Sequence, residues 1–193
     1  MDILEKLFGS PAKVRIMKLL LFHPGSVFDV KEICKRTQTT TDKARKEIRG
    51  LEKIGFLKRK KNAKEKNKLV CWGLNNDFPY IKHLQSMLVH TNPFAGRDIA
   101  KKFKNSGDIK LLIISGIFIQ DWESRVDLMI VGDKLKRPAL HSAIKTLEAD
   151  MGRELRYTLL ETEDFDYRMN IYDKLVRDVL DFPHEKILNK LNV

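Results

Sequence analysis

The stretch RTQTTTDKARKEIRGLEKIGF, residues 36–56, decides the fold of the first part of this chain. Its apolar residues recur at helical spacing, so the sequence predicts an amphipathic helix over residues 41–54 with Thr40 as its N-cap. Gly55 fits the position after a helix C-terminus. The apolar stripe consists of Ala44, Ile48 and Leu51. The remaining surface is mainly basic and carries Lys43, Arg45, Lys46, Arg49 and Lys53.

The segments on either side complete a recognisable order of elements. Ser10 and Pro11 open an earlier helix, because serine caps helices well and proline suits the first helical position. Asp29, with Glu32 three residues later, is typical of a capping box and starts a short helix that ends near Thr37. A strand beginning at Phe56, a basic loop over residues 59–68 and an apolar strand over residues 69–72 then predict a β-hairpin. Helix, helix, helix and hairpin together predict a winged helix.

Positive charge is concentrated in the same part of the chain. The 193 residues have a net charge of +11. Residues 1–90 contain 20 lysines and arginines against 9 acidic residues, whereas residues 91–193 contain 17 of each. This asymmetry indicates a module that binds a polyanion, joined to a neutral one.

The run VKEICKRTQTTTDKARKEIRGLEKIGFL, residues 30–57, resembles the winged-helix regulators of the arsenic-repressor type. The match lies in Leu51, Glu52, Gly55 and Phe56, which lead into the wing of that family. Gln38 stands where the turn of that family usually has glycine, so Gln38 is expected to adopt a positive φ angle or a different turn.

The resemblance and the basic face together predict contact with double-stranded DNA. Helix 41–54 would enter the major groove, where arginine pairs with guanine, and lysine and threonine would contact phosphates. The basic wing, residues 58–68, would follow the backbone. The expected DNA-binding residues are Thr40, Thr41, Lys43, Arg45, Lys46, Arg49, Lys53, Arg59, Lys60, Lys61, Lys64, Lys66 and Lys68.

Three domains or segments are expected, in an α+β fold. Residues 1–78 form the winged helix, residues 79–93 a connector helix and residues 94–193 a small α/β domain. The connector could pack on the winged helix, pair with its copy in a dimer or act as a rigid spacer. In the α/β domain the patterns predict strands at 109–118, 126–131 and 155–160. Helices are predicted from about Asp98, from Pro138, after Thr162 as an N-cap and from Asp173, and a short terminal segment begins at Ile187.

The runs LLIISGIF and SRVDLMIVGD, which begin at Leu111 and Ser124, resemble the core of minimal nucleotidyltransferase domains. Gly116 and Asp127 match that pattern, in which two carboxylates hold metal ions for a nucleotide. Ile117 replaces the usual serine, and Met129 replaces the second carboxylate. The resemblance therefore implies a nucleotidyltransferase-like domain that has lost catalysis and needs no cofactor.

Other chemistry is not indicated by the residue pattern. The five histidines are scattered, and Cys34 and Cys71 make no paired motif, so no metal site is expected. Apolar runs such as residues 111–119 are far too short for a membrane span. Acidic residues near the start and two unpaired cysteines are typical of a cytoplasmic protein.

These observations predict a prokaryotic transcriptional regulator that binds DNA as a homodimer, because paired recognition helices match symmetric half-sites. Its second domain would serve in dimerisation, in sensing a small molecule or in binding a protein partner. Two alternatives stay open. One is a nucleotidyltransferase whose substrate is held by the basic domain, and the other is a winged-helix module for protein or RNA.

Overall fold

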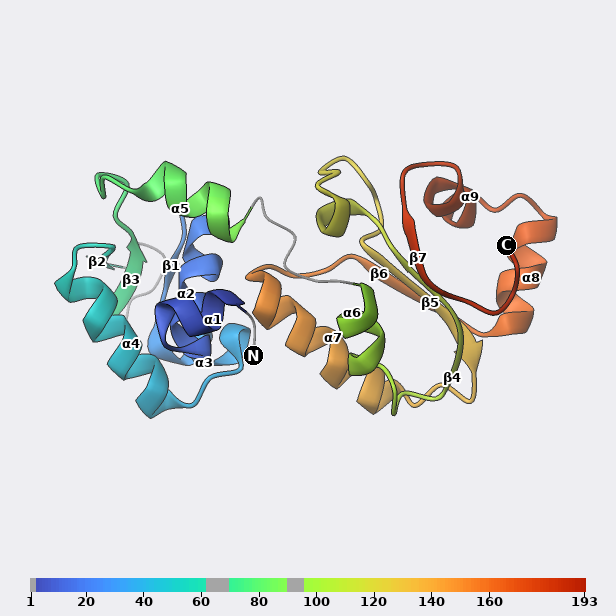
Figure 1. Ribbon diagram of the computed structural model, residues 1–193, viewed down its shortest axis with the longest axis horizontal. Helices are drawn as coiled ribbons and strands as arrows, with labels where there is room; N and C mark the ends of the chain where they lie inside the picture. The colour runs from blue at the N-terminus through green and yellow to red at the C-terminus, as the bar shows by residue number, and fades with distance from the viewer. Residues whose placement is uncertain (1–2, 62–69, 90–95) are drawn as a thin grey trace. The chain divides into compact units, whose positions relative to one another are not determined.

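The computed structural model describes residues 3–61, 70–89 and 96–193, and its fold is α+β (Figure 1). The chain divides into two units, which are described separately. The first comprises Met1–Thr91 with Lys145–Arg153, and the second comprises Asn92–Ile144 with Glu154–Val193. Within the described ranges, no helix is long and apolar enough to cross a membrane.

The first unit combines helices with a small antiparallel sheet of order β1-β3-β2. Gly73 of β3 lies against β1, where an added Cβ would come within 3.1 Å of the Ser26 carbonyl oxygen. The elements in chain order are α1 (Ile3–Phe8), α2 (Pro11–Phe22), β1 (Val27–Phe28), α3 (Val30–Thr37), α4 (Thr41–Lys53), β2 (Leu57–Lys61), β3 (Val70–Leu74) and α5 (Ile81–Leu88).

Side-chain caps set the starts of helices α2 and α3. Ser10 accepts a hydrogen bond from the Lys13 amide at 3.3 Å, and Asp29 accepts one from the Glu32 amide at 2.7 Å. Both caps agree with the sequence-based prediction. Thr40 is the N-cap of α4 as predicted, yet its side chain makes no capping bond.

The core of the first unit lies between its helices and its sheet. Phe56 is fully buried and meets Phe78 edge to face, with 5.6 Å between ring centroids. Helix α5 packs on this core, since Leu88 is buried within it and Ile81 and Leu84 pack against it. Of the three roles left open for this helix, the structure therefore supports packing on the first unit.

The second unit is built on a four-stranded sheet of order β6-β5-β4-β7. Strand β4 runs antiparallel to both β5 and β7, while β6 is parallel to β5. The elements are α6 (Gly96–Lys102), β4 (Asp108–Ile114), the 3-10 helix η1 (Gly116–Ile119), β5 (Leu128–Asp133), α7 (Arg137–Met151), β6 (Tyr157–Leu160), α8 (Thr162–Asn170), α9 (Lys174–Leu180) and β7 (Glu185–Asn189).

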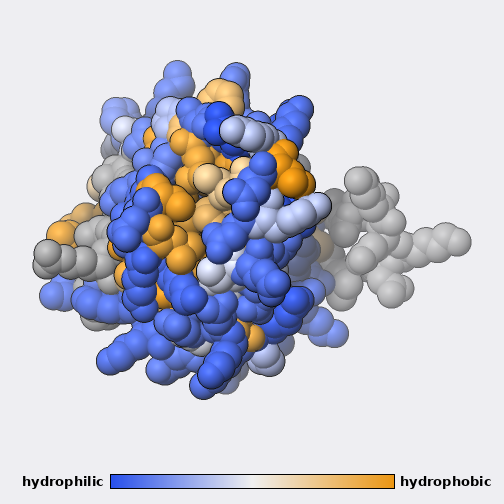
Figure 2. All heavy atoms as spheres, turned by 90° about the vertical axis from the view of Figure 1, so that its right-hand side faces the viewer, coloured by the Kyte–Doolittle hydropathy of each residue, from blue (hydrophilic) through white to orange (hydrophobic). Residues whose placement is uncertain are grey.

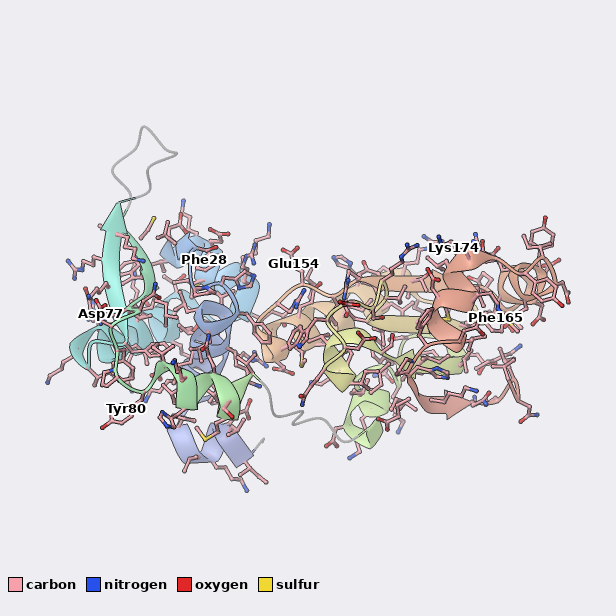
Figure 3. The ribbon with its side chains drawn as sticks, turned by 90° about the horizontal axis from the view of Figure 1, so that it is seen from above. Phe28, Asp77, Tyr80, Glu154, Phe165 and Lys174 are labelled. Carbon is pink, nitrogen blue, oxygen red and sulfur yellow. The ribbon has the colours of Figure 1, made fainter. Side chains whose placement is uncertain are left out.

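Helices α8 and α9 bury their inner faces against one side of this sheet. Phe165 of α8, labelled in Figure 3, and Val176 of α9 are fully buried. They share a core cluster with Leu111 of β4 and Met129 of β5. Helix α7 spans the division between the units, because its residues from Lys145 onward belong to the first.

Three sequence-based assignments need correction. The strand predicted at 109–118 ends at Ile114, because the chain then turns into η1. The N-cap of α8 is Glu161, so Thr162 is its first helical residue. The segment around Ile187 is strand β7, whose pairing with β4 was not foreseen.

Candidate nucleic-acid interface

Helix α4 separates its apolar and basic residues as its sequence predicts. Ala44, Ile48 and Leu51 are almost fully buried in the core of the first unit. The exposed surface of the helix holds Lys43, Arg45, Lys46, Arg49 and Lys53. Burial of the apolar stripe therefore fixes which way the five cations face.

The turn before α4 is set by Gln38, which ends α3 in a left-handed conformation with φ 49°. Of the two alternatives expected for Gln38, a positive φ angle or a different turn, the structure therefore has the positive φ angle. The Gln38 side chain also accepts a hydrogen bond from Thr146, at 3.2 Å, within the first unit. Thr40 and Thr41 follow as exposed residues at the start of α4.

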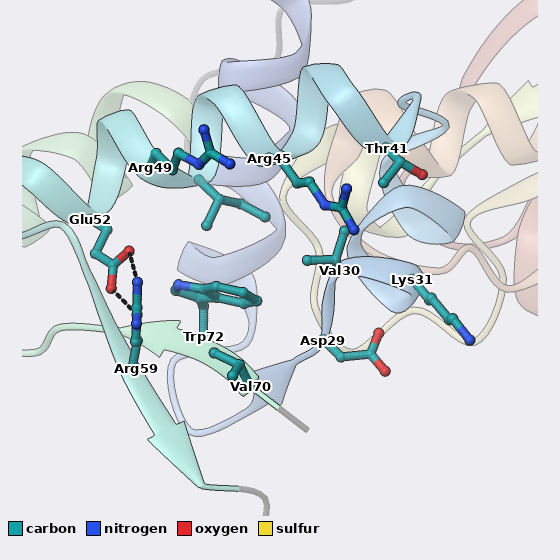
Figure 4. A pocket seen from close by; sticks show the side chains of 11 residues that line it. Asp29, Val30, Lys31, Thr41, Arg45, Arg49, Glu52, Arg59, Val70 and Trp72 are labelled. Carbon is teal, nitrogen blue, oxygen red and sulfur yellow. Dashed lines mark hydrogen bonds and ion pairs between the residues drawn. The ribbon is translucent and has the colours of Figure 1, made fainter. Parts of the chain in front are cut away.

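An ion pair joins α4 to the β2–β3 hairpin. The Glu52 carboxylate accepts hydrogen bonds from Nε of Arg59 at 2.6 Å and from Nη2 at 3.3 Å (Figure 4). Arg59 lies directly opposite Trp72 in the hairpin register. This cation is partly neutralised, so its role differs from that of the arginines on α4.

A hollow of about 520 Å³ lies between α4, the start of α3 and the hairpin. Figure 4 shows Arg45 and Arg49 projecting from α4 on one side of it, with Trp72 and Val70 of β3 on the other. The apolar lining consists of Val30, Ile48, Val70 and Trp72. The polar and charged lining consists of Asp29, Lys31, Thr41, Arg45, Arg49, Glu52 and Arg59.

Trp72 packs against the core of the first unit at the base of the hairpin and also lines this hollow. It is half-buried, and its indole nitrogen has no hydrogen-bond partner among the described residues. Its position depends on the β2–β3 register, which places it opposite Arg59. Lys31 also lines the hollow and was not anticipated, because it belongs to α3.

The described side chains of the hairpin include three cations, Lys58, Arg59 and Lys60. Lys60 is half-buried, and Lys58 is paired with Asp77 at 2.8 Å, a contact that lowers the pKa of that carboxyl. The backbone of Lys61 ends β2. Lys64, Lys66 and Lys68 lie outside the described residues.

Lys43 and Lys46 also line a second hollow, of about 340 Å³, together with Ser10 and Arg15. Arg15 is held in place, because it pairs with Asp150 at 2.7 Å and donates to the Thr37 carbonyl oxygen at 3.2 Å. It therefore supports the end of α3 within the first unit.

The nucleotidyltransferase-like positions form a closed cluster in the second unit. Asp127 is fully buried, and its carboxylate accepts a bond from the Ile117 amide at 3.0 Å and one from the Arg156 amide at 2.8 Å. The Arg156 guanidinium donates two more, at 3.1 Å and 3.0 Å. This contact with Asp127 raises the pKa of Arg156.

Gly116 is required beside this carboxylate, since an added Cβ would lie 2.1 Å from Oδ1 of Asp127. Met129 is fully buried in the core that faces α8 and α9. In the part of the chain that the structure describes, no group of three or more histidine, cysteine or acidic side chains could hold a metal ion. The cluster thus satisfies the Asp127 carboxylate with four donors from the chain itself.

Comparison of the chain with protein-family models, with curated proteins and with solved structures finds no match.

Proposed function

We propose that this protein is a winged-helix transcriptional regulator that binds double-stranded DNA. The observation that carries the proposal is the exposed basic face of α4, which borders a hollow shared with the β2–β3 hairpin. The order of helices and the sheet order β1-β3-β2 also suit a winged helix. Solvated basic helices are common, but here the cations border a hollow that an extended polyanion fits.

In this proposal α4 lies in the major groove. Arg45 and Arg49 reach base edges, where a guanidinium bonds guanine in two places. Lys43, Lys46 and Lys53 contact phosphates, and the hydroxyls of Thr40 and Thr41 approach the backbone at the start of the helix. The contacts that select a sequence are therefore assigned to the two arginines.

The β2–β3 hairpin serves as the wing. Arg59 and Lys60 lie on β2, from which the basic segment of residues 62–68 continues. The apolar lining around Trp72 and Val70 suits the deoxyribose of a backbone that passes between α4 and the wing. Phosphates on either side of that sugar would meet the cations on the rim.

The second unit would have a regulatory rather than a catalytic role. A two-metal transfer reaction needs carboxylates whose oxygens face an open site. The Asp127 carboxylate is buried and already accepts four hydrogen bonds. This geometry favours a structural role for Asp127 over the enzyme alternative.

Selection from a pool of randomised DNA duplexes, followed by fluorescence anisotropy on the enriched sequence, tests the proposal. We expect Arg49→Glu and Lys46→Glu to weaken binding more than tenfold, because Arg49→Glu removes a base contact, Lys46→Glu removes a phosphate contact, and both place a negative charge against the DNA. Lys136→Glu makes the same charge change at an exposed residue of the second unit and should leave the affinity nearly unchanged.

The salt dependence of the binding constant provides a second test. The logarithm of the binding constant should fall linearly with the logarithm of salt concentration, and less steeply for a variant that has lost a phosphate contact. Failure of the selection to enrich any duplex, together with unchanged binding of Arg49→Glu, would contradict the proposal. Preference for an RNA duplex over the same sequence as DNA would favour the RNA alternative.

A further inference from the structure

Large apolar side chains are exposed on α8, on α9 and in the segments that directly follow these two helices. Figure 2 faces this end of the second unit and shows hydrophobic residues together in a field of hydrophilic ones. The large hydrophobic residues that are exposed here are Tyr167, Ile171, Tyr172, Leu175 and Phe182. We call these five residues the α8–α9 patch. Four partly buried residues pack against the core of the same unit, namely Met169, Leu180, Leu191 and Val193.

The patch does not contribute to the core of its own unit. The inner residues Phe165, Val176 and Val179 already fill the space between these helices and the sheet. Ile171 and Phe182 are 54% and 60% exposed, so each leaves most of its apolar surface in water. Isolated apolar residues are ordinary on a surface, whereas a contiguous group marks an interaction site.

Several charged residues of α8 and α9 are paired inside the unit. Arg168 pairs with Asp164 at 3.0 Å, and Arg177 pairs with Asp181 at 2.7 Å. Asp178 is paired with Arg125 at 3.2 Å. The surroundings of the patch therefore carry charges of both signs, several of them in pairs within the unit.

We infer that the α8–α9 patch is the surface through which a second copy of this chain binds. A two-fold axis places the patch of one copy against the same patch of the other. Apolar surface then contacts apolar surface, and charges of both signs surround the contact. The net charge of +11 would make two copies repel each other if they met through residues 1–90. The second unit can approach its copy without that penalty, because residues 91–193 are neutral overall.

The inference deepens the proposed function, because a dimer presents two α4 helices to a symmetric operator. The role of the dimer in operator binding rests on the proposed function, but contact between the two copies does not require DNA. Mass can therefore be measured on the free protein, so failure of the dimer and failure of DNA binding are seen in separate experiments.

Sedimentation velocity of the full chain at micromolar and higher concentrations, without DNA, is the direct test. The expected mass is twice the 22.5 kDa of the chain. The double variant Ile171→Glu/Phe182→Glu should sediment at 22.5 kDa, because it places two charges on the patch. An unchanged circular dichroism spectrum would show that this variant still folds.

Ile54→Glu is the matched control, since Ile54 is a similarly exposed apolar residue of the first unit, at 62%. This variant should remain dimeric. A wild-type chain that stays monomeric throughout the concentration range would overturn the inference. A dimer that persists in the double variant but dissociates in Ile3→Ser/Leu7→Ser would also overturn it, because it would move the contact to α1.

A separate measurement of DNA affinity tests whether this dimer serves operator binding. The monomeric double variant should retain binding to a duplex with one half-site and lose most of its preference for a duplex with two. Equal preference in the variant and the wild type, despite the change in mass, would overturn the assignment of this dimer to operator binding.

Discussion

Glu52 of α4 accepts two hydrogen bonds from the guanidinium of Arg59 on β2, at 2.6 Å and 3.3 Å. The pair joins the helix and the hairpin that the proposed function places on DNA. Arg59 is 66% exposed, so the pair adds little stability, on the order of 0.5 kcal/mol for such a surface contact. Its larger effect is on the charge and the position of Arg59.

Substitution of Arg59 and substitution of Glu52 should change the affinity for DNA in opposite directions. Arg59→Ala should weaken binding several-fold, because a cation beside the backbone is lost. Glu52→Gln should strengthen binding to non-specific duplexes, because it removes an acid from the same face. Anisotropy titrations of both variants check this. Equal weakening in both variants would instead show that the pair acts by positioning the hairpin.

Gln38 carries backbone strain that a glycine would relieve. A non-glycine residue in the left-handed region costs about 1 kcal/mol or more, whereas glycine adopts it freely. We expect Gln38→Val to lower stability by about 1–2 kcal/mol, because a β-branched residue is least suited to φ 49°. Gln38→Gly should be near neutral, since relief of strain is offset by the greater freedom of glycine in the unfolded chain.

Urea unfolding of the two Gln38 variants gives the comparison directly. Gly55→Ala is a useful companion, because Gly55 has φ +80° and no atom within 4 Å of an added Cβ. It therefore isolates the backbone cost without a steric clash. If Gln38→Val were as stable as Gln38→Gly, the left-handed turn would not be a source of strain.

The pair formed by Asp127 and Arg156 should respond asymmetrically to substitution. Asp127→Leu leaves two amides and a guanidinium without their acceptor, and should cost about 3–5 kcal/mol. Arg156→Met should cost less, because the Ile117 and Arg156 amides still bond the carboxylate and Arg156 is 43% exposed. Unfolding followed by Trp122 fluorescence in a Trp72→Phe background measures both.

The same protein tests the structural role assigned to Asp127. Mg²⁺ or Mn²⁺ at millimolar concentration should leave the unfolding midpoint of the wild type unchanged, since no oxygen of the carboxylate lacks a donor. A midpoint that rises with metal, and only when Asp127 is present, would contradict this assignment.

Stability at low pH should depend on Asp133. The Lys110 ammonium, and then hydrogen bonding from Thr162, hold the pKa of Asp133 below its usual value. A carboxyl whose pKa is depressed by folding stabilises the protein above its unfolded pKa, near 4, and this contribution is lost as the pH falls through the folded value. Asp133→Asn should flatten the pH dependence of unfolding below about pH 4.

Unfolding midpoints between neutral and acid pH, compared with those of Glu163→Gln on the exposed surface of α8, provide the measurement. The complementary effect lies at alkaline pH. Asp133 raises the pKa of Lys110, so the contribution of the lysine is present below its unfolded pKa and lost above its folded one. Parallel curves for wild type and Asp133→Asn below pH 4 would count against this linkage.

Trp72 should report on the hollow beside α4. The chain has two tryptophans, so Trp122→Phe leaves Trp72 as the sole emitter. Occupation of the hollow by a DNA backbone should change the intensity and wavelength of its emission. The change should saturate with the anisotropy curve and be absent in Arg49→Glu. Emission that stays constant while anisotropy rises would place the DNA elsewhere.

Features that depend on neighbours in sequence were predictable. The caps at Ser10 and Asp29, the left-handed turn at Gln38 and the amphipathic division of α4 all follow from residues within one or two turns. Features that depend on distant partners were not. The predicted strand over 109–118 ran too far because Gly116 adopts φ 54° and the Phe118 amide bonds the Ser115 carbonyl oxygen, which starts η1.

Some residues of the candidate site were predictable from local sequence, and others were not. The five cations of α4 were identified from helical spacing alone, since burial of one stripe orients the rest. The hollow and the place of Trp72 in it were missed, because they require the register of β2 with β3. Likewise β7 has no strong strand pattern, and its pairing with β4 decides its structure.

The position of β7 has a consequence for biosynthesis. Strand β4 can pair with β5 during synthesis before β7 exists. The β4 edge that pairs with β7 stays unpaired until the ribosome adds residues 185–189. Until then β4 presents unpaired amides and carbonyls along that edge, a template for pairing with other nascent chains. Premature termination before residue 185 should therefore yield an insoluble product, even though the sheet of the first unit is complete at Leu74.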